Sequence, residues 1–439
     1  MRPLVEALIR GGHDVLETVV ERLQAGVRVA SVNPSAGGTG EGEFQTLVAA
    51  ELERLGCAVE SWEPDAAALS ERFPAARPYL PSSGFRTRPN VIGWAPTAEP
   101  LGGRRAHLIL NSHADTVGAG DPSGWRFPPF SGTVADGHLH GLGAVDAKGC
   151  MFAFLGAFAV LRAAGVTLRR SVMLQSVVDE EAGGAGVLDC IRRGYTAGAA
   201  LVGEPTSLRV CPGSRGSMTL VLRVVGRGAH PGEGWRGVNA IHAAWRYVEA
   251  LERLRDGLDR TRMHPLWAPL PVGHVWNLMA VNSGPAGRSV PDRCEVRYSV
   301  GVIGAERLTE LQDVVAACVA GVTAADPWLI EHPPTIEWSP PSMEPAVIEP
   351  THPAVAAMVA AGVDLGEDPV GVQAFSAASD GRHLMNSGGI PAINFGPGDL
   401  HRCHSPGEEL PVAELRRAMT WIALFMARYC GVARGPAER

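Results

Sequence analysis

Runs of apolar residues alternate with amphipathic stretches over the first two hundred residues of the chain. Three short runs of Leu, Val, Ile and Ala have the length of buried strands, at residues 106–110, 171–178 and 199–202. Three stretches show helical character, at residues 43–55, 150–164 and 186–193. Strands that alternate with helices indicate a mainly parallel sheet with helices on both faces. The pattern therefore predicts an α/β fold, in which active sites form outside the carboxyl ends of the strands.

The pattern changes after residue 204. Two halves, each a strand followed by a helix, are predicted. The first has a strand at residues 217–225 and a helix at 239–253, and the second has a strand at 294–302 and a helix at 306–320. Two such halves are typical of a compact α+β domain, which we place at residues 215–340. Residues 1–214 and 341–439 would then form one discontinuous catalytic domain, with the Pro-rich stretch 338–345 as the linker back. Residues 63–88, rich in Pro, Ser and Arg, are expected to form a surface excursion.

Length, charge and cysteine content restrict the class of protein. A chain of 439 residues predicts two domains, because single domains usually stop growing near roughly 250–300 residues. The net charge of −7 argues against a nucleic-acid partner. Eight cysteines without Cys-x-x-Cys spacing indicate reduced thiols. The longest uncharged apolar run, 149–161, is too short to span a membrane, and Glu6 makes the N-terminus a poor signal peptide, so we expect a cytoplasmic protein.

Histidines and carboxylates gather at places where the sheet would bring them together. The candidate ligands are His113, Asp146, Glu181, Glu204 and His404. His113, Glu181 and Glu204 each follow a predicted strand, and Asp146 lies in a loop of small residues, 141–149, where a short carboxylate can approach two metals closely. Histidine and carboxylate are ligands that catalytic zinc prefers, and three ligands per metal leave a position open for water. The pattern predicts a two-metal hydrolytic site.

Two further carboxylates stand next to these ligands. Glu180, beside Glu181, can take a proton from a water molecule and return it to a leaving amine. Asp115, two residues after His113, is placed to accept the other ring N–H of that histidine and so fix its tautomer. A metal site with a spare general base is typical of an amide hydrolase.

Each motif also has a plainer interpretation. Glu180 and Glu181 could be a solvated charge pair, although they follow an apolar strand and precede Ala-Gly-Gly; Glu204 alone could be a helix start. Gly141-Leu-Gly143 begins a dinucleotide-binding pattern, but Asp146 stands where its third glycine belongs. Cys403, next to His404, is interpreted as a packed thiol rather than a nucleophile. The sequence contains neither the Gly-x-Ser-x-Gly of serine hydrolases nor the His-Glu-x-x-His of zincins.

Taken in order, the motifs resemble those of a known family over residues 15–430. They are Trp125–Phe130, Gly141–Gly149, Asp179–Glu181, Gly228–Pro231, Ser289–Asp292, Ser379–Arg382 and Phe395–Gly398. The chain resembles the metallopeptidases and deacylases that include acetylornithine deacetylase, succinyl-diaminopimelate desuccinylase, carboxypeptidase G and aminoacylase.

The resemblance implies roles for particular residues. One metal would be held by His113, Asp146 and Glu204, and the other by Asp146, Glu181 and His404. Glu180 would be the general base and later the acid. The metals would be two zinc ions, with cobalt or manganese as alternatives. The inserted domain would serve as lid and dimer interface, and His230 would reach into the partner subunit's site to stabilise the oxyanion, unless it is simply a turn histidine.

Some substrate-binding positions depart from the family pattern. Desuccinylases carry Asn in the segment matching Arg288-Ser289, and an Arg where this chain has Gly301. Succinyl-diaminopimelate is therefore not the expected substrate. The remaining candidates for anchoring polar substrate groups are Arg215, Ser379 and Arg382, although Arg382 could equally be a structural ion-pair partner.

These observations predict a homodimeric amidohydrolase that removes an acyl group from the nitrogen of an amino acid or similar small amine. A dipeptidase or carboxypeptidase would use the same site with a different substrate, and so would a deformylase of an amine that is not an amino acid. The alternative from another class is a metal-binding scaffold without activity, which would have no use for Glu180 as a base.

Overall fold

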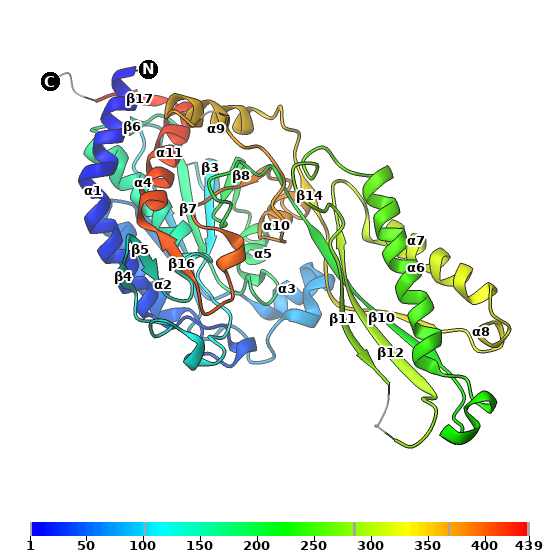
Figure 1. The fold of residues 1–439 in the computed structure, drawn as a ribbon. Helices are drawn as coiled ribbons and strands as arrows, with labels where there is room; N and C mark the ends of the chain where they lie inside the picture. The colour runs from blue at the N-terminus through cyan, green and yellow to red at the C-terminus, as the bar shows by residue number, and fades with distance from the viewer. Residues whose placement is uncertain (1, 101, 284–286, 368, 437–439) are drawn as a thin grey trace. The chain divides into compact units, whose positions relative to one another are not determined.

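The computed structural model describes residues 2–100, 102–283, 287–367 and 369–436. The chain forms two compact units (Figure 1). The larger unit contains Met1–Gly213, Val347–Phe375 and Ser379–Arg439, and the smaller unit contains Ser214–Ala346 and Ser376–Ala378. None of the helices in these residues has both the length and the apolar character that a membrane crossing requires.

The larger unit is built on a six-stranded sheet in the order β1-β2-β7-β3-β8-β15. Its strands are β1 (Ala58–Trp62), β2 (Asn90–Trp94), β3 (Arg105–His113), β7 (Val172–Val177), β8 (Thr196–Val202) and β15 (Ala392–Asn394). The pairs β7/β3, β3/β8 and β8/β15 are parallel, whereas β1/β2 and β2/β7 are antiparallel. The predicted α/β fold class with a mainly parallel sheet is confirmed.

Helices cover both faces of this sheet because its central strands are apolar on both sides. In β3, Leu108 and Leu110 contribute to the main core, while Ile109 contributes to a second core on the other face. The main core contains residues of α1 (Arg2–Arg28), α2 (Gly42–Arg54), α4 (Lys148–Ala163), α9 (Pro353–Asp364) and α11 (Val412–Cys430). The second core contains residues of α5 (Ala185–Arg192) and α10 (Gly381–Asn386).

Helix α4 is buried around almost its whole circumference, which explains its uninterrupted apolar sequence. It packs against both α1 and α11, and Figure 1 shows these three helices side by side. Gly156 permits the close contact with α11, since a Cβ there would lie 2.2 Å from the Met419 sulfur. Helix α1, by contrast, is amphipathic and buries one side, including Leu8 and Leu23.

Short elements complete the larger unit. They are β4 (Thr133–Ala135), β5 (His138–His140) and β16 (Glu409–Pro411) in one small sheet, β6 (Thr167–Leu168) paired with β17 (Val432–Arg434), and the 3-10 helices η1 (Pro34–Ala36), η3 (Pro122–Gly124) and η5 (Leu400–Arg402). A further pair joins β9 (Gly213–Ser214) and β14 (Ala346–Val347), at the boundary between the two units.

Residues 63–88 are more than a surface excursion. They form α3 (Ala66–Arg72) and the 3-10 helix η2 (Pro74–Tyr79). Leu69, Ala76 and Phe85 from this segment form a small buried cluster with Val178 and residues of α5. The segment therefore packs against the chain that carries Glu180 and Glu181.

The smaller unit is a four-stranded antiparallel sheet with helices packed on one face. The strand order is β11-β12-β10-β13, with β10 (Gly216–Val225), β11 (Trp276–Asn282), β12 (Arg293–Val302) and β13 (Thr335–Met343). The helices are α6 (Ala240–Thr261), α7 (Leu308–Ala324) and α8 (Pro327–Glu331), preceded by the 3-10 helix η4 (Pro231–Arg236). Alternate residues of β10 and β12 pack against α6 and α7 in one core.

The prediction of a linker at residues 338–345 is wrong for most of that stretch. Residues 335–343 form β13, which pairs with β10 across a bulge at Met218/Thr219. Strand β13 lies at the edge of the sheet, where proline is tolerated because one side of the strand makes no ladder hydrogen bonds.

A buried histidine joins two carboxylates in the smaller unit. His274 is fully buried, with Nδ1 2.8 Å from Asp259 and Nε2 3.0 Å from Glu306. Burial opposes the charged ring, but the hydrogen bonds to Glu306 and Asp259 outweigh it and raise the pKa of His274.

Candidate metal centre and active site

The larger unit brings all five predicted ligands together. His113 ends β3, Glu181 follows β7 and Glu204 follows β8, so the carboxyl ends of neighbouring strands place them at one edge of the sheet. Asp146 lies just before α4, and His404 follows η5. Each of two groups has its ligand atoms within 4.8 Å of one another: His113, Asp146 and Glu204, and Asp146, Glu181 and His404.

Asp146 belongs to both groups, and its two oxygens face different histidines. Oδ1 is 3.0 Å from Nε2 of His113, and Oδ2 is 3.4 Å from Nε2 of His404. Nε2 of His404 is also 3.2 Å from Oε1 of Glu181. One carboxylate with one oxygen directed to each group is the arrangement that a residue bridging two metals requires.

The electrostatics of the cluster suit cations. Burial, followed by the charge of Asp146, raises the pKa of Glu204 well above its usual value. Burial also raises the pKa of Glu181 to about 7, against the hydrogen bond from His404. Hydrogen bonds to Asp146 and Glu181 raise the pKa of His404 to about 10. The carboxylates thus attract positive charge strongly, and the histidine and carboxylate donor set fits divalent metals such as zinc.

Asp115 organises the chain behind the ligands. It is fully buried, and its carboxylate accepts the backbone N–H groups of Glu180 and Glu181, each at 3.1 Å. Nδ1 of His113 lies 3.1 Å from the carbonyl oxygen of Asp115 and 3.6 Å from its carboxylate. Asp115 therefore contacts the His113 ring and also holds the turn that carries Glu180 and Glu181.

The loop that carries Asp146 is fixed from two sides by residues that the sequence did not single out. Oε1 of the buried Glu408 accepts the backbone N–H groups of Val145 at 2.9 Å and Asp146 at 3.3 Å. Lys148, fully buried, donates to the carbonyls of Gly26 and Val29 at the end of α1, at 3.1 and 2.6 Å. Burial lowers the pKa of Lys148 to about 7. Position within motifs was the available signal, since Lys148 lies in the small-residue loop and Glu408 closely follows His404.

Glu180 belongs to neither group of ligand atoms. Its carboxylate is 3.4 Å from Nη1 of Arg382, which also donates to the carbonyl of Ser379 at 2.8 Å. The Ser379 hydroxyl donates to Asn394 Oδ1 at 2.6 Å. Among the described residues, neither carboxylate oxygen of the buried Asp380 has a hydrogen-bond partner. Burial, and then the charge of Glu180, raise the pKa of Asp380 well above its usual value.

Cys403 has the character of a packed thiol. Its side chain is half-buried against the main core, and its Sγ lies 3.8 Å from the carbonyl of Asp399. Burial raises the pKa of this thiol strongly, followed by the charge of Asp146. A thiol held in its neutral form is a poor nucleophile.

The other candidates lie in the smaller unit. His230 is exposed at the start of η4, where its Nδ1 accepts the N–H of Gly232 at 3.1 Å. Arg215 is buried and donates to the carbonyls of Ser376 and Val272, at 2.8 and 3.2 Å. Burial lowers its pKa to about 10. A Cβ on Gly301 would lie 3.1 Å from Cδ of Arg215, so the glycine provides the space that this arginine occupies.

Known sequences match the chain over most of its length. The model of peptidase family M20/M25/M40 matches residues 109–428. An N-formyl-4-amino-5-aminomethyl-2-methylpyrimidine deformylase from Halalkalibacterium halodurans is 28% identical over 420 residues, covering 92% of both chains. An acetylornithine deacetylase from Pasteurella multocida is 26% identical over 353 residues, covering 80% of this chain and 86% of the relative.

Solved structures share the fold. The aminopeptidase PepT from Bacillus cereus superposes with a TM-score of 0.69 at 17% identity, covering 94% of this chain and 98% of that one. A dinuclear metal-binding peptidase of the M20 family from Bacillus subtilis superposes with a TM-score of 0.62 at 16% identity, with the same coverage.

Fold and family together define a hydrolase that acts on amide bonds. The chain belongs to peptidase family M20/M25/M40. This agrees with the family resemblance in the sequence motifs, which is confirmed.

Proposed function

We propose that the protein is a two-metal deacylase that removes a small acyl group from the nitrogen of an amino acid or a similar small amine. The observation that carries this proposal is the pair of ligand groups that share Asp146, with Glu180 close by but outside both groups. His113, Asp146 and Glu204 would hold one metal, and Asp146, Glu181 and His404 the other. When bound, two divalent ions, with zinc first and cobalt or manganese as alternatives, polarise the scissile carbonyl and lower the pKa of the attacking water.

The protein's own groups would move the proton and set the geometry. Glu180 accepts a proton from the attacking water and donates it to the leaving amine. Arg382 lies within ion-pair distance of Glu180 and fixes the direction of its carboxylate. Asp115 holds the backbone on which both Glu180 and Glu181 stand. Ser379 and Arg215 would contribute to substrate recognition.

A formylated amine is a second candidate substrate. The pyrimidine deformylase matches 92% of this chain, against 80% for the acetylornithine deacetylase. Acetylornithine deacetylases act on an amino acid, whereas the deformylase is named for a formylated aminomethylpyrimidine, so the two relatives define the two ends of the substrate range to be tested.

We further propose that the protein is a homodimer and that the smaller unit serves as lid and dimer interface. Strand β11 is an edge strand that exposes Leu278, Met279 and Val281, with 63% of Met279 accessible. An exposed apolar edge strand favours pairing with another chain. In such a dimer His230 would donate to the oxyanion in the partner subunit's site.

The test combines metal analysis of the purified protein with a panel of N-formyl, N-acetyl and N-succinyl amino acids, amines and dipeptides. Two metal ions per chain and turnover that disappears in Glu180→Gln are expected. The best substrate separates a deacetylase, a deformylase and a peptidase. Metal binding without turnover of any acyl amine, and no effect of Glu180→Gln, would favour an inactive metal-binding scaffold instead.

A further inference from the structure

The turn that carries Glu180 and Glu181 has an unusual backbone at its start. Asp179 is buried and has a φ of +72°, in the left-handed region that side chains other than glycine seldom adopt. A residue persists in that conformation only where its surroundings hold it. The three consecutive N–H groups of Asp179, Glu180 and Glu181 all donate to buried carboxylates, the first to Glu41 Oε1 at 3.0 Å and the other two to Asp115.

A buried ion pair stands behind this turn. Nε of Arg88 donates to Oε2 of Glu41 at 2.6 Å, and Nη2 donates to Oε1 of Glu41 at 2.7 Å. The same Nη2 donates to Oδ1 of Asp179 at 2.8 Å. The side chain of Arg88 is 4% exposed and that of Glu41 is fully buried. Nδ2 of Asn33 donates to Asp115 at 2.8 Å and to Asp179 at 3.3 Å, which joins the ion pair to Asp115.

The charges in this network depend on one cation. Three buried carboxylates, those of Glu41, Asp179 and Asp115, lie in the network. Within the part of the chain that the structure describes, Arg88 is the one cation hydrogen-bonded to Glu41 or Asp179. Without it, Glu41 and Asp179 would both lose their charged partner, and they would keep only the neutral donors, the Asp179 N–H for Glu41 and Asn33 for Asp179.

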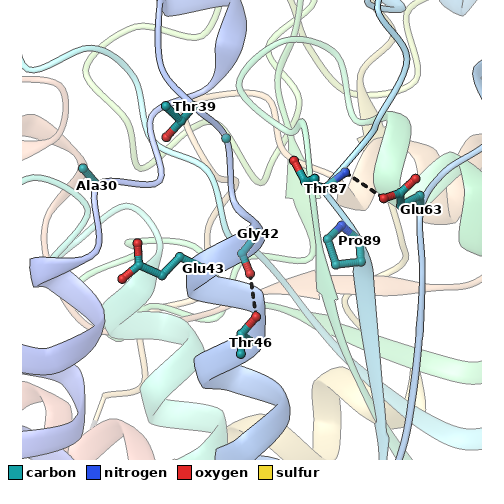
Figure 2. Close-up of a pocket in the computed structure, with 9 residues that line it drawn as sticks. Ala30, Thr39, Gly42, Glu43, Thr46, Glu63, Thr87 and Pro89 are labelled. Carbon is teal, nitrogen blue, oxygen red and sulfur yellow. Dashed lines mark hydrogen bonds between the residues drawn. The ribbon is translucent and has the colours of Figure 1, made fainter.

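The chain around Glu41 and the end of the 63–88 segment, which supply the two residues of the ion pair, lie close together at the protein surface. They meet at a hollow of about 430 Å³ lined by Thr39, Gly42, Thr46, Glu63 and Thr87, among others (Figure 2). Figure 2 shows Thr87 hydrogen-bonded to Glu63, whose Oε1 accepts the Thr87 N–H at 2.7 Å. A Cβ on Gly42 would lie 2.1 Å from the carbonyl oxygen of Thr87. Glycine at the start of α2 therefore permits the end of the 63–88 segment to approach and deliver Arg88.

We propose that Arg88, held by Glu41, is a positioning residue that fixes Asp179 and thereby orients Glu180 and Glu181 toward the metals and the attacking water. This inference rests on the proposed two-metal function. It also assigns a role to the 63–88 segment, which is to bring a guanidinium behind the catalytic turn. A guanidinium is needed because it binds Glu41 through two nitrogens while donating to Asp179, which the single ammonium of lysine cannot reproduce in the same geometry.

The experiment compares Arg88→Gln and Arg88→Lys with the control Arg193→Gln. Arg193 also pairs with a fully buried carboxylate, that of Asp189, at 3.1 Å, but makes no bond to the turn. Hydrogen exchange of the metal-free proteins measures the exchange rates of the backbone amides of residues 179–181. Cobalt titration, followed by visible absorption, measures metal affinity, and steady-state kinetics separate kcat from KM.

We expect the amides of residues 179–181 to exchange about tenfold faster or more in Arg88→Gln. Cobalt affinity and kcat should each fall by about 10–100-fold, the usual effect of losing a residue that orients a ligand, with little change in KM. Arg88→Lys should be intermediate in all three readouts. Arg193→Gln should lower thermal stability without changing any of them.

Unchanged exchange and unchanged cobalt affinity in a folded Arg88→Gln protein would overturn the proposal, as would identical changes in Arg193→Gln. If Arg88→Gln does not fold, Arg88→Lys and Glu41→Gln carry the same test. The same measurements distinguish a failure of the proposed two-metal function from a failure of this proposal. A wild-type protein that binds no cobalt refutes the metal centre, whereas the exchange rates of its turn still report whether Arg88 positions it.

Discussion

Replacing Glu408 tests how firmly the Asp146 loop is held. Its Oε1 is the acceptor for two buried N–H groups, those of Val145 and Asp146. Glu408→Ala leaves both donors without this acceptor, at a cost of about 1–3 kcal/mol for each. The bond to Asp146 is the longer one, at 3.3 Å, so we expect a combined loss of about 2–4 kcal/mol in the free energy of unfolding.

Glu408→Gln is the matched control. Glutamine keeps the Oε1 acceptor, and among the described residues Oε2 of Glu408 has no partner to lose. We therefore expect a loss of about 1 kcal/mol or less. Urea unfolding of the metal-free proteins measures both values, and zinc competition should show that Glu408→Ala also weakens metal binding by about 10–100-fold. Equal losses for the two variants would refute the assignment of Oε1 as the group that holds this loop.

Three other predictions concern the mechanism, the dimer and the smaller unit. Glu180→Gln should lower kcat by about 10²–10⁴-fold while the metal content is unchanged, because Glu180 is outside both ligand groups; metal analysis beside kinetics checks this. Met279→Asp should give a monomer in light scattering. Mixing inactive His230→Ala dimers with inactive Glu180→Gln dimers should restore activity if His230 acts across the interface. The pKa of His274 is raised in the folded protein, so protonation of its ring stabilises the fold. This contribution is full below about pH 6.5 and is lost as the pH rises through the folded-state pKa of His274. Urea unfolding from pH 6 to 10 should show that loss, and His274→Gln should abolish it.

The sequence located three of the five residues that the structure brings together because each of the three stands in a short motif at the end of a strand. His113 ends β3, and Glu181 and Glu204 follow β7 and β8, so locating the strands also located the carboxyl edge of the sheet. The fold class followed from the same alternation. Unusual residue types in apolar surroundings made these positions visible without any knowledge of tertiary contacts.

The contacts behind the ligands could not be predicted from the sequence because they join residues that lie far apart along the chain. Arg88 meets Glu41 across 47 positions and Asp179 across 91, and Glu408 meets Val145 across 263. Nothing local to Arg88 distinguishes it from the other arginines of a Pro- and Arg-rich stretch. Strand β13 was missed because prolines usually end strands, and only its place at the sheet edge makes them acceptable.

The discontinuous construction of the larger unit also sets the order of events during synthesis. The chain is made from the N-terminus, so His113, Asp146, Glu181 and Glu204 leave the ribosome before residues 214–346, which form the smaller unit. His404 and Glu408 emerge only afterwards, and they are followed by α11, which packs against α1 and α4. A growing chain can bring together His113, Asp146 and Glu204 early. The second group, which needs His404, and the hydrogen bonds from the Asp146 loop to Glu408 require a nearly finished polypeptide. Under the proposed function, the second group of ligands is therefore complete only once His404 has been made, and chains truncated before this residue lack that group.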